Sequence, residues 1–338
     1  MKNSHIVENK EHEAVNGSML RGPVLPSLGH SQKELTIQEV ERGPPHEALF
    51  LVLAYLPLFE LLNMSEVCRS LRDAVDKDVL LWLDIIVEKP LNMLFSDEIM
   101  IKLTSKANGR LRTLALMSCT KITDDGLQQV IEKNPHINRL YLPACTGLTP
   151  EGIMRAVKTL TESYQALKCV KINGVYNMKK EHLETLSSYL QMNPAKMEGQ
   201  MQQLCFFHDY RNISVLRVEE SYRPIDMEIC PRCNEVRMVF DCPRETCKKK
   251  RERAMAECRG CYFCIPRCEE CGKCIEVEEP GEVVCADVLC SDCWLQLPKC
   301  NFCNRPYCSR HANLQHSTPG STGFICCICH VNFIGDFM

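Results

Sequence analysis

The feature that most constrains the fold is a concentration of cysteine towards the end of the chain. Of 24 cysteines in 338 residues, 19 lie at or after Cys230. Residues 1–10 are polar and charged and lack the apolar core of a signal peptide, so we expect an intracellular protein in a reducing compartment. Thiols stay free in such a compartment, and this density of cysteine therefore indicates metal binding before disulfide bonds.

Most of these cysteines form pairs separated by two residues, a spacing at which one turn presents both sulfurs to the same tetrahedral zinc ion. At four ligands an ion, they predict about four to five structural Zn ions, with Cys242/Cys247 as a looser pair. A polar unit of this size lacks a hydrophobic core, so metal binding would supply its folding free energy. The predicted metal ligands are Cys230, Cys233, Cys258, Cys261, Cys264, Cys268, Cys271, Cys274, Cys290, Cys293, Cys300, Cys303, Cys308, His311, Cys326 and Cys329.

The sequence leaves the pairing of these ligands open. In one arrangement Cys290/Cys293 join Cys308/His311 while Cys300/Cys303 join Cys326/Cys329, which gives a cross-braced, RING-like or FYVE-like geometry. In another, Cys271/Cys274 close a simple ribbon with Cys290/Cys293. The H-x-E and P-C-x-x-C signature of zinc deaminases is absent, and we predict no catalytic residue. Candidates for the remaining ligand places are Cys285, Cys327 and His330.

An internal repeat precedes the cysteine-rich end. The five positions that begin at Leu111 recur 26 residues later from Ile137 and, after a longer spacer, from Leu167. Each L-x-x-L-x-L stretch predicts a strand and is followed by a helical pattern, which is typical of cysteine-containing leucine-rich repeats. We expect a short α/β solenoid over residues 84–190. Its concave face would either bind a protein or only space the two ends of the chain, and it includes Arg139, Tyr141, Lys168 and Lys171.

Before the repeats, leucine and valine follow helical spacing in three short stretches, and Pro57 separates the first from the second. Three helices within about 40 residues cannot bury all of these side chains among themselves. Part of this apolar surface therefore requires a partner outside the unit. The helices could also act only as a cap that closes the exposed end of the repeat array.

This stretch resembles the F-box family. The family's motifs stand here as Pro44-Pro45 followed by Glu47, Val52 with Leu56, Leu61-Leu62, Val67-Cys68-Arg69 and Trp82. Pro44 replaces the family's leading leucine, and Trp82 comes one position later than usual. The resemblance implies a three-helix platform that docks on the Skp-type adaptor of an SCF ligase and, through it, on a cullin. It also implies the adaptor-binding residues Pro45, Val52, Leu56, Pro57, Leu61 and Val67.

We expect a multidomain α+β chain. Its parts are a disordered tail (1–43), a helical F-box (44–83), the leucine-rich repeats (84–190), a connector (191–225) and a small multi-zinc cysteine-rich module (226–338). This order is similar to that of plant F-box proteins of the Skp-interacting-partner group. The resemblance implies the substrate-recognition subunit of an SCF ubiquitin ligase, which is not itself an enzyme and holds an unknown protein substrate through the repeats or the zinc module.

Two other functions stay open. Interleaved zinc sites could form a RING that acts as a ubiquitin ligase directly, although six residues between Cys293 and Cys300 are few for the first loop of a RING. The basic run Lys248–Arg253 could be a nuclear localisation element or a phosphate-binding loop, but a formal net charge of −3 argues against a nucleic-acid partner.

The longest apolar run, Ala48 to Phe59, is too short to span a membrane. We therefore expect a soluble protein of the nucleus and/or cytoplasm.

Overall fold

The computed structural model describes residues 46–164, 167–191, 204–208, 223–252, 258–275, 281–317 and 323–335. The predicted disordered tail and Pro45 lie outside these ranges, as does most of the predicted connector. Within the described ranges, no helix is long and apolar enough to cross a membrane. The cis peptide bond between Lys89 and Pro90 follows the first strand of the sheet described below.

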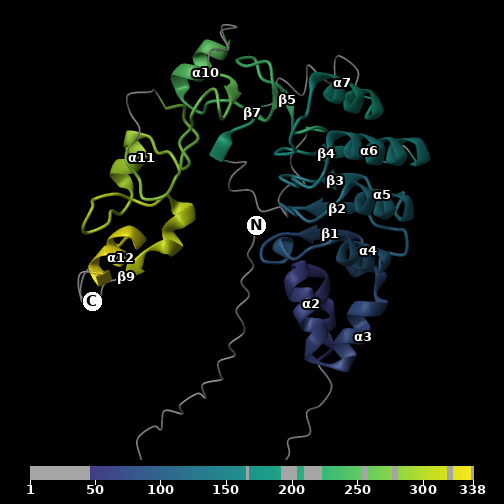
Figure 1. Ribbon diagram of the computed structural model, residues 1–338. Coiled ribbons are helices and arrows are strands. Elements are labelled where there is room, and N and C mark those ends of the chain that lie inside the picture. Colours follow the sequence, from purple (N-terminus) through teal and green to yellow (C-terminus); the bar gives the residue numbers. More distant parts are fainter. Residues whose placement is uncertain are drawn as a thin grey trace, which may run out of the picture. The chain divides into compact units, whose positions relative to one another are not determined.

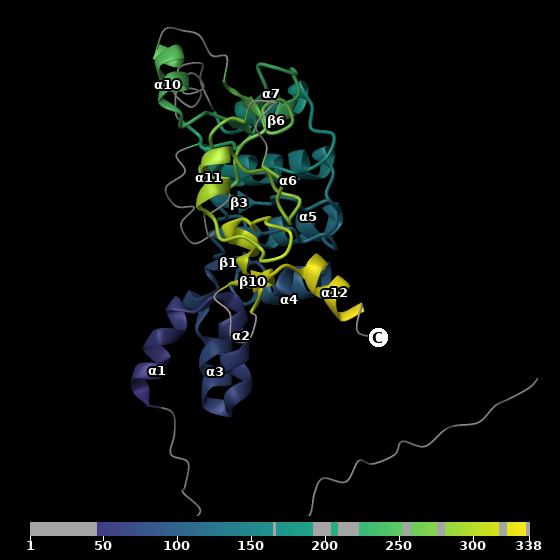
Figure 2. The same cartoon turned by 90° about the vertical axis from the view of Figure 1, so that its left-hand side faces the viewer.

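The first described elements are short helices (Figure 2). Pro57 and Cys68 have extended backbones and separate them, so the chain turns sharply at each. Trp82 is fully buried, and its indole Nε1 donates to the Val75 carbonyl oxygen at 2.8 Å. This hydrogen bond connects the helix that contains Val75 to the short 3-10 helix that contains Trp82. The elements are α1 (Glu47–Val52), η1 (Leu53–Tyr55), α2 (Leu58–Val67), α3 (Arg69–Lys77) and η2 (Val79–Trp82).

A four-stranded parallel sheet follows, with strand order β1-β2-β3-β4 and one helix after each strand (Figure 1). Thr113 of β2 lies opposite Arg139 of β3, so the register of the sheet matches the period of the sequence. The repeated leucine positions face the helices and are buried, as for Leu114 and Leu140. Assignment to the leucine-rich-repeat class stays a prediction. The elements are β1 (Asp84–Val87), η3 (Leu91–Met93), α4 (Asp97–Ser105), β2 (Thr113–Leu116), α5 (Asp124–Lys133), β3 (Arg139–Tyr141), α6 (Pro150–Tyr164), β4 (Cys169–Lys171) and α7 (Lys180–Tyr189).

The sheet face for which the sequence left both protein binding and mere spacing open is partly closed. Ala115, Tyr141 and Cys169 are buried together on neighbouring strands. Lys171 lies over the Tyr141 ring, with Nζ at 4.9 Å from the ring centroid. Tyr141 therefore packs within the sheet face, and the prediction that it is presented to a partner is corrected. Lys168 is exposed, as expected.

The chain after residue 223 joins the end of this sheet. Val170 of β4 donates its backbone N–H to the Pro224 carbonyl oxygen at 2.7 Å, and Ile225 forms a parallel bridge with Val170. The Asp226 carboxylate accepts the backbone N–H groups of Ile172 at 2.9 Å and Asn173 at 3.1 Å. Burial raises the pKa of Asp226 to about 6, even though these two hydrogen bonds favour the charged form. Residues 224–226 thus extend the sheet beyond its last strand.

The cysteine-rich part contains only short elements, as expected for a unit without a large hydrophobic core. Its strands are two residues long and pair antiparallel, β5 with β6, β7 with β8 and β9 with β10. One of its small buried clusters combines Cys268, Cys290 and Cys308 with Ile275 and Leu289. The elements are β5 (Glu228–Ile229), β6 (Val236–Arg237), β7 (Val239–Phe240), α10 (Glu245–Glu252), β8 (Gly260–Cys261), α11 (Ser291–Gln296), η5 (Ser309–Leu314), β9 (His316–Ser317), β10 (Phe324–Ile325) and α12 (Cys327–Gly335).

Candidate metal centres and partner surface

Five groups of four side chains bring their ligand atoms together, each atom within 4.8 Å of the others in its group. We name each group by its first residue. Four contain only cysteine, the composition of a closed structural zinc site. The fifth combines two cysteines with a carboxylate and an imidazole. The groups are Cys230/Cys233/Cys261/Cys264, Cys242/Cys247/Cys258/Cys274, Cys268/Cys271/Cys290/Cys293, Cys300/Cys303/Cys326/Cys329 and Cys285/Asp287/Cys308/His311.

The same turn begins three of the all-cysteine groups. The first cysteine of the turn accepts, through its carbonyl oxygen, the N–H of the residue four positions later, at 2.9 Å for Asn234, 2.8 Å for Gly272 and 3.0 Å for Asn304. That residue has a positive φ of 59°, 69° and 55°, respectively. Asparagine and glycine tolerate this conformation at little cost. The sequence C-x-x-C followed by Asn or Gly therefore folds locally into a turn that points both sulfurs the same way.

Backbone N–H groups prepare the buried sulfurs of these turns for ionisation. Cys230 Sγ accepts the Cys261 N–H, and Cys300 Sγ accepts the Cys326 N–H, both at 3.3 Å. Burial raises the pKa of Cys230, but the backbone N–H groups of Cys233 and Cys261 outweigh it and lower the pKa to about 7. The same balance lowers the pKa of Cys300 to about 6. Because a thiolate is the form that binds zinc, this geometry favours the ligand state.

The structure divides two runs of cysteine that looked continuous in the sequence. Cys258 belongs to the Cys242 group, whereas Cys261 and Cys264 belong to the Cys230 group. Cys274 likewise leaves Cys268/Cys271 and completes the Cys242 group. The loose pair Cys242/Cys247, which was not among the predicted ligands, thus supplies half of one group. Since α10 begins at Glu245 between these two cysteines, their wider spacing fits a helical turn.

One predicted pairing matches the structure and another does not. Cys300/Cys303 meet Cys326/Cys329, as in the cross-braced arrangement. Cys290/Cys293 meet Cys268/Cys271, so the prediction that they join Cys308/His311 is corrected. Of the alternative partners Cys271/Cys274, Cys271 does join them and Cys274 does not. The reason is positional, because α11 starts immediately after Cys290 and carries Cys293 back to the turn at Cys268.

Two residues predicted for the remaining places have other contacts. Tyr307 donates its hydroxyl to Cys327 Sγ at 3.0 Å. The His330 ring stacks on the His316 ring at 4.2 Å between centroids. Cys285 does join a group, together with Asp287, which the sequence did not suggest. The sequence contains no spacing signal for Asp287, because enough cysteines were available to complete the sites without it.

Apolar side chains are exposed on α1, η1 and α2. Of the predicted adaptor-binding residues, Val52, Pro57 and Val67 are exposed and Leu56 is half-buried. Leu61 is only 3% exposed and packs in the main core, so its prediction as a contact is corrected. The sequence missed three exposed side chains of the same region, which are Leu51, Tyr55 and Phe59.

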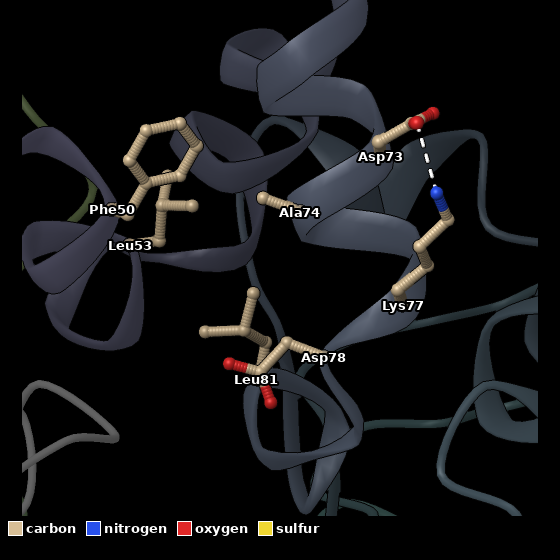
Figure 3. A pocket seen from close by; sticks show the side chains of 7 residues that line it. All are labelled: Phe50, Leu53, Asp73, Ala74, Lys77, Asp78 and Leu81. Atoms are coloured by element: carbon tan, nitrogen blue, oxygen red, sulfur yellow. Dashed lines mark hydrogen bonds and ion pairs between the residues drawn. The ribbon is translucent and has the colours of Figure 1, made fainter. Parts of the chain in front are cut away.

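A pocket of about 360 Å³ lies between the first helices and the turn η2 (Figure 3). Phe50, Leu53 and Leu81 line it with apolar surface. Lys77 and Asp73, on α3, form an ion pair at 2.9 Å at one side of the pocket. The pocket is therefore an apolar hollow with a charged edge, beside the exposed residues of α1.

Two family models match the chain. One, described as F-box-like, matches residues 45–87, and the other, described as the At3g27290 F-box protein C-terminal domain, matches residues 226–302. F-box protein SKIP28 of Arabidopsis thaliana is 41% identical to the chain over 284 residues, which are 82% of this chain and 86% of that relative. The chain belongs to the plant F-box proteins of the Skp-interacting-partner group. The membership expected from the sequence is confirmed.

Two further Arabidopsis thaliana relatives of this F-box protein are longer than the matched region. F-box protein SKIP14 is 34% identical over 75% of this chain and 55% of its own length. F-box protein At3g27290 is 38% identical over 68% of this chain and 60% of its own length. The chain therefore covers little more than half of the length of these two relatives.

The C-terminal family match includes all ligands of the Cys230, Cys242 and Cys268 groups. It ends at residue 302, before Cys303 and Cys308. The Cys300 and Cys285 groups of this F-box protein thus extend beyond the matched region.

The basic run Lys248–Arg253 lies mostly on α10, where Lys248 pairs with Glu245 at 2.8 Å, so part of its charge is balanced locally.

Proposed function

We propose that this F-box protein is the substrate-recognition subunit of an SCF ubiquitin ligase. Its first helices would bind a Skp-type adaptor and, through it, a cullin. The sheet and its helices, which we assign to the cysteine-containing leucine-rich repeats, or the cysteine-rich module would hold a protein substrate. The match to the F-box-like model and the names of two relatives support this role.

The observation that carries the proposal is the exposed apolar surface of the first helices. Tyr55 is 86% exposed and Leu51 is 75% exposed, and they lie within three residues of the exposed Val52 in the sequence. Burying apolar surface contributes about 25 cal/mol for each Å², so a surface of this kind gains free energy when a partner covers it. The core of a stable protein interface has this apolar character.

The proposed role includes four structural zinc ions, one in each all-cysteine group. Four thiolates fill all four tetrahedral positions, so no position stays open for a substrate or a reactive water. The ions would act as the core of the module and would supply its folding free energy. These sites therefore support a binding module in preference to a catalytic one.

Adaptor binding can be tested with a matched pair of variants. The double variant Val52→Asp/Tyr55→Asp places charge on the exposed surface and is expected to weaken binding to a purified Skp-type adaptor at least tenfold, about 1.4 kcal/mol. Tyr176→Asp is the control, since Tyr176 is similarly exposed but lies between β4 and α7. The affinity would be measured by calorimetry. Failure of the intact protein to bind, or equal losses in both variants, would contradict the proposal.

The second candidate function is a ubiquitin ligase that acts through a RING-like module. One observation favours it, because the ligand pairs of the Cys285 and Cys300 groups alternate along the chain, as they do in a cross-braced fold. Ubiquitin transfer by the full chain with only E1 and E2, abolished by Cys326→Ser, would support this function. Transfer that requires the adaptor and a cullin would support the substrate receptor.

A further inference from the structure

The Cys285 group differs from the other four in its ligand atoms. Asp287 Oδ2 lies 2.9 Å from Cys308 Sγ and 2.8 Å from His311 Nδ1, and the last two atoms are 3.2 Å apart. Zinc bonds of 2.0–2.3 Å in a tetrahedron place neighbouring ligand atoms about 3.3–3.8 Å apart. These three side chains would therefore need to separate by only about 0.5 Å to hold an ion, and the Cys285 sulfur lies within 4.8 Å of each of their ligand atoms.

The group is partly enclosed by the fold, and three of its four residues are half-buried. Cys308 is fully buried, and the Asp287 side chain is 14% exposed. Ser309, which follows Cys308, donates its hydroxyl to Glu270 Oε2 at 2.9 Å, and Arg310 forms an ion pair with Glu269 at 3.6 Å. Both glutamates lie in the turn that begins the Cys268 group. The turn from Cys308 to His311 is thus attached to the neighbouring group on one side.

On its other side the group is attached to the Cys300 group. Val284 donates its backbone N–H to the Pro306 carbonyl oxygen at 3.0 Å, and Lys299 forms an antiparallel bridge with Pro306. Tyr307, next to Cys308, packs in one buried cluster with Cys300 and Cys326. The Cys285 group therefore lies between two all-cysteine groups and contacts both.

The donor atoms determine which metal the group would bind and how firmly. Two thiolates and an imidazole are ligands that zinc accepts readily, whereas a carboxylate oxygen is a harder donor that suits magnesium, calcium or manganese better. The usual structural zinc sites consist of four cysteines, of three cysteines and a histidine, or of two cysteines and two histidines, without a carboxylate. An ion held by this mixed set should accordingly be bound less firmly than an ion held by four thiolates.

We propose that Cys285, Asp287, Cys308 and His311 bind a fifth zinc ion, which joins the Cys268 and Cys300 groups and is the first ion that a chelator removes. Four protein ligands complete a tetrahedron, so the ion has a structural role. The inference rests on the zinc sites of the proposed function and is independent of adaptor binding. The proposed site contains Asp287, which was not among the ligands predicted from the sequence.

Zinc content of the purified full chain tests the site. We expect five ions in the wild-type protein and four in Asp287→Asn, because an amide cannot supply the anionic oxygen. Asp292→Asn is the matched control, since Asp292 lies on α11 between Cys290 and Cys293 and pairs with Lys273, at 3.6 Å. Four ions in the wild type, or five in Asp287→Asn, would overturn the fifth site alone. Absence of zinc from the wild type would overturn all five.

A second measurement on the folded protein does not depend on the stability of Asp287→Asn. A colorimetric chelator added to the wild type is expected to remove about one fifth of the zinc in a fast phase, followed by the rest. Asp287→Cys changes the site to three thiolates and one imidazole, and should keep five ions and lose the fast phase. Release of all zinc in one phase from the wild type, or an unchanged fast phase in Asp287→Cys, would contradict the inference.

Discussion

Single carboxylates set the contact between successive helices of the sheet unit. Asp97 accepts the Thr123 backbone N–H at 3.0 Å and the Thr123 hydroxyl at 2.6 Å. Asp124 makes the same pair of contacts with Thr149, one repeat later. Gly126 is required beside Asp97, because a Cβ there would overlap the carboxylate. Each aspartate is therefore the first residue of one helix, and its carboxylate orients the threonine that caps the next helix.

Asp124→Ala removes the acceptor of two Thr149 groups at the beginning of α6. We expect a loss of about 1 kcal/mol, the usual effect of a lost helix cap or hydrogen bond, and a lower Tm in differential scanning calorimetry. Asp125→Ala is the control, because its ion pair with Arg155 is exposed and should contribute little. Equal decreases in the two variants would show that the contact to Thr149 is not the cause.

Residue by residue, the sequence predicted ligands well where the backbone alone places them. Cys230/Cys233 and Cys300/Cys303 share a local turn, so their spacing is sufficient. Asp287 meets Cys308 only through the tertiary fold, and an aspartate two residues after a cysteine is too common to indicate a ligand. Leu61 shows the same limit, because helical spacing finds the apolar face but not which of its leucines the neighbouring helix covers.

The elements of the sheet unit could be predicted because their period is regular, whereas its last edge could not. Residues 224–226 extend the sheet after a long stretch of chain, and no repeat pattern marks them. Their place depends on the Asp226 carboxylate, which accepts two N–H groups at the end of β4. The connection between the sheet and the cysteine-rich part therefore includes this side chain and one backbone bridge, together with Met227 and Val236, which pack in the core of the sheet unit.

Asp226→Ala should loosen this edge without affecting metal binding. It leaves the N–H groups of Ile172 and Asn173 without their acceptor, and an unpaired buried donor costs about 1–3 kcal/mol. We expect faster amide hydrogen exchange in the peptide that contains both residues, with an unchanged zinc content. Glu235→Ala, an exposed carboxylate of the same segment, is the control. Unchanged exchange in Asp226→Ala would mean that the Ile225 bridge and the packing of Met227 and Val236 hold the edge without the carboxylate.

Zinc would change the charge of the chain as well as its fold. The formal net charge of −3 counts every thiol as neutral. An ion with four thiolates adds two negative charges, so four such sites would bring the net charge to about −11. Arg267 is fully buried within this part, and it donates to the carbonyl oxygens of Phe240 at 2.7 Å and Cys258 at 2.9 Å. This buried guanidinium is a positive charge within the part of the chain that the zinc sites would make more negative.

Removal of zinc should therefore unfold one part of the protein and leave another intact. The sheet unit and the first helices share a continuous apolar core, which runs from Leu53 to Leu186 and also takes in Met227 and Val236 at the start of the cysteine-rich part. The rest of the cysteine-rich part has only small clusters in which cysteine is a main component, so its folding should depend on the metal. We expect chelation under reducing conditions to abolish hydrogen-exchange protection over residues 228–335, with protection retained over residues 84–190.

Addition of zinc to the stripped protein should restore protection, which separates metal loss from irreversible damage. Magnesium at the same concentration is the control, because thiolates do not select it. Adaptor binding should survive chelation, since Leu51, Val52 and Tyr55 belong to the part that keeps its core. Loss of protection in both regions would mean that the sheet unit depends on the cysteine-rich part for its stability. Protection retained in both would mean that the thiols pack without metal, and the zinc sites would then have to be abandoned.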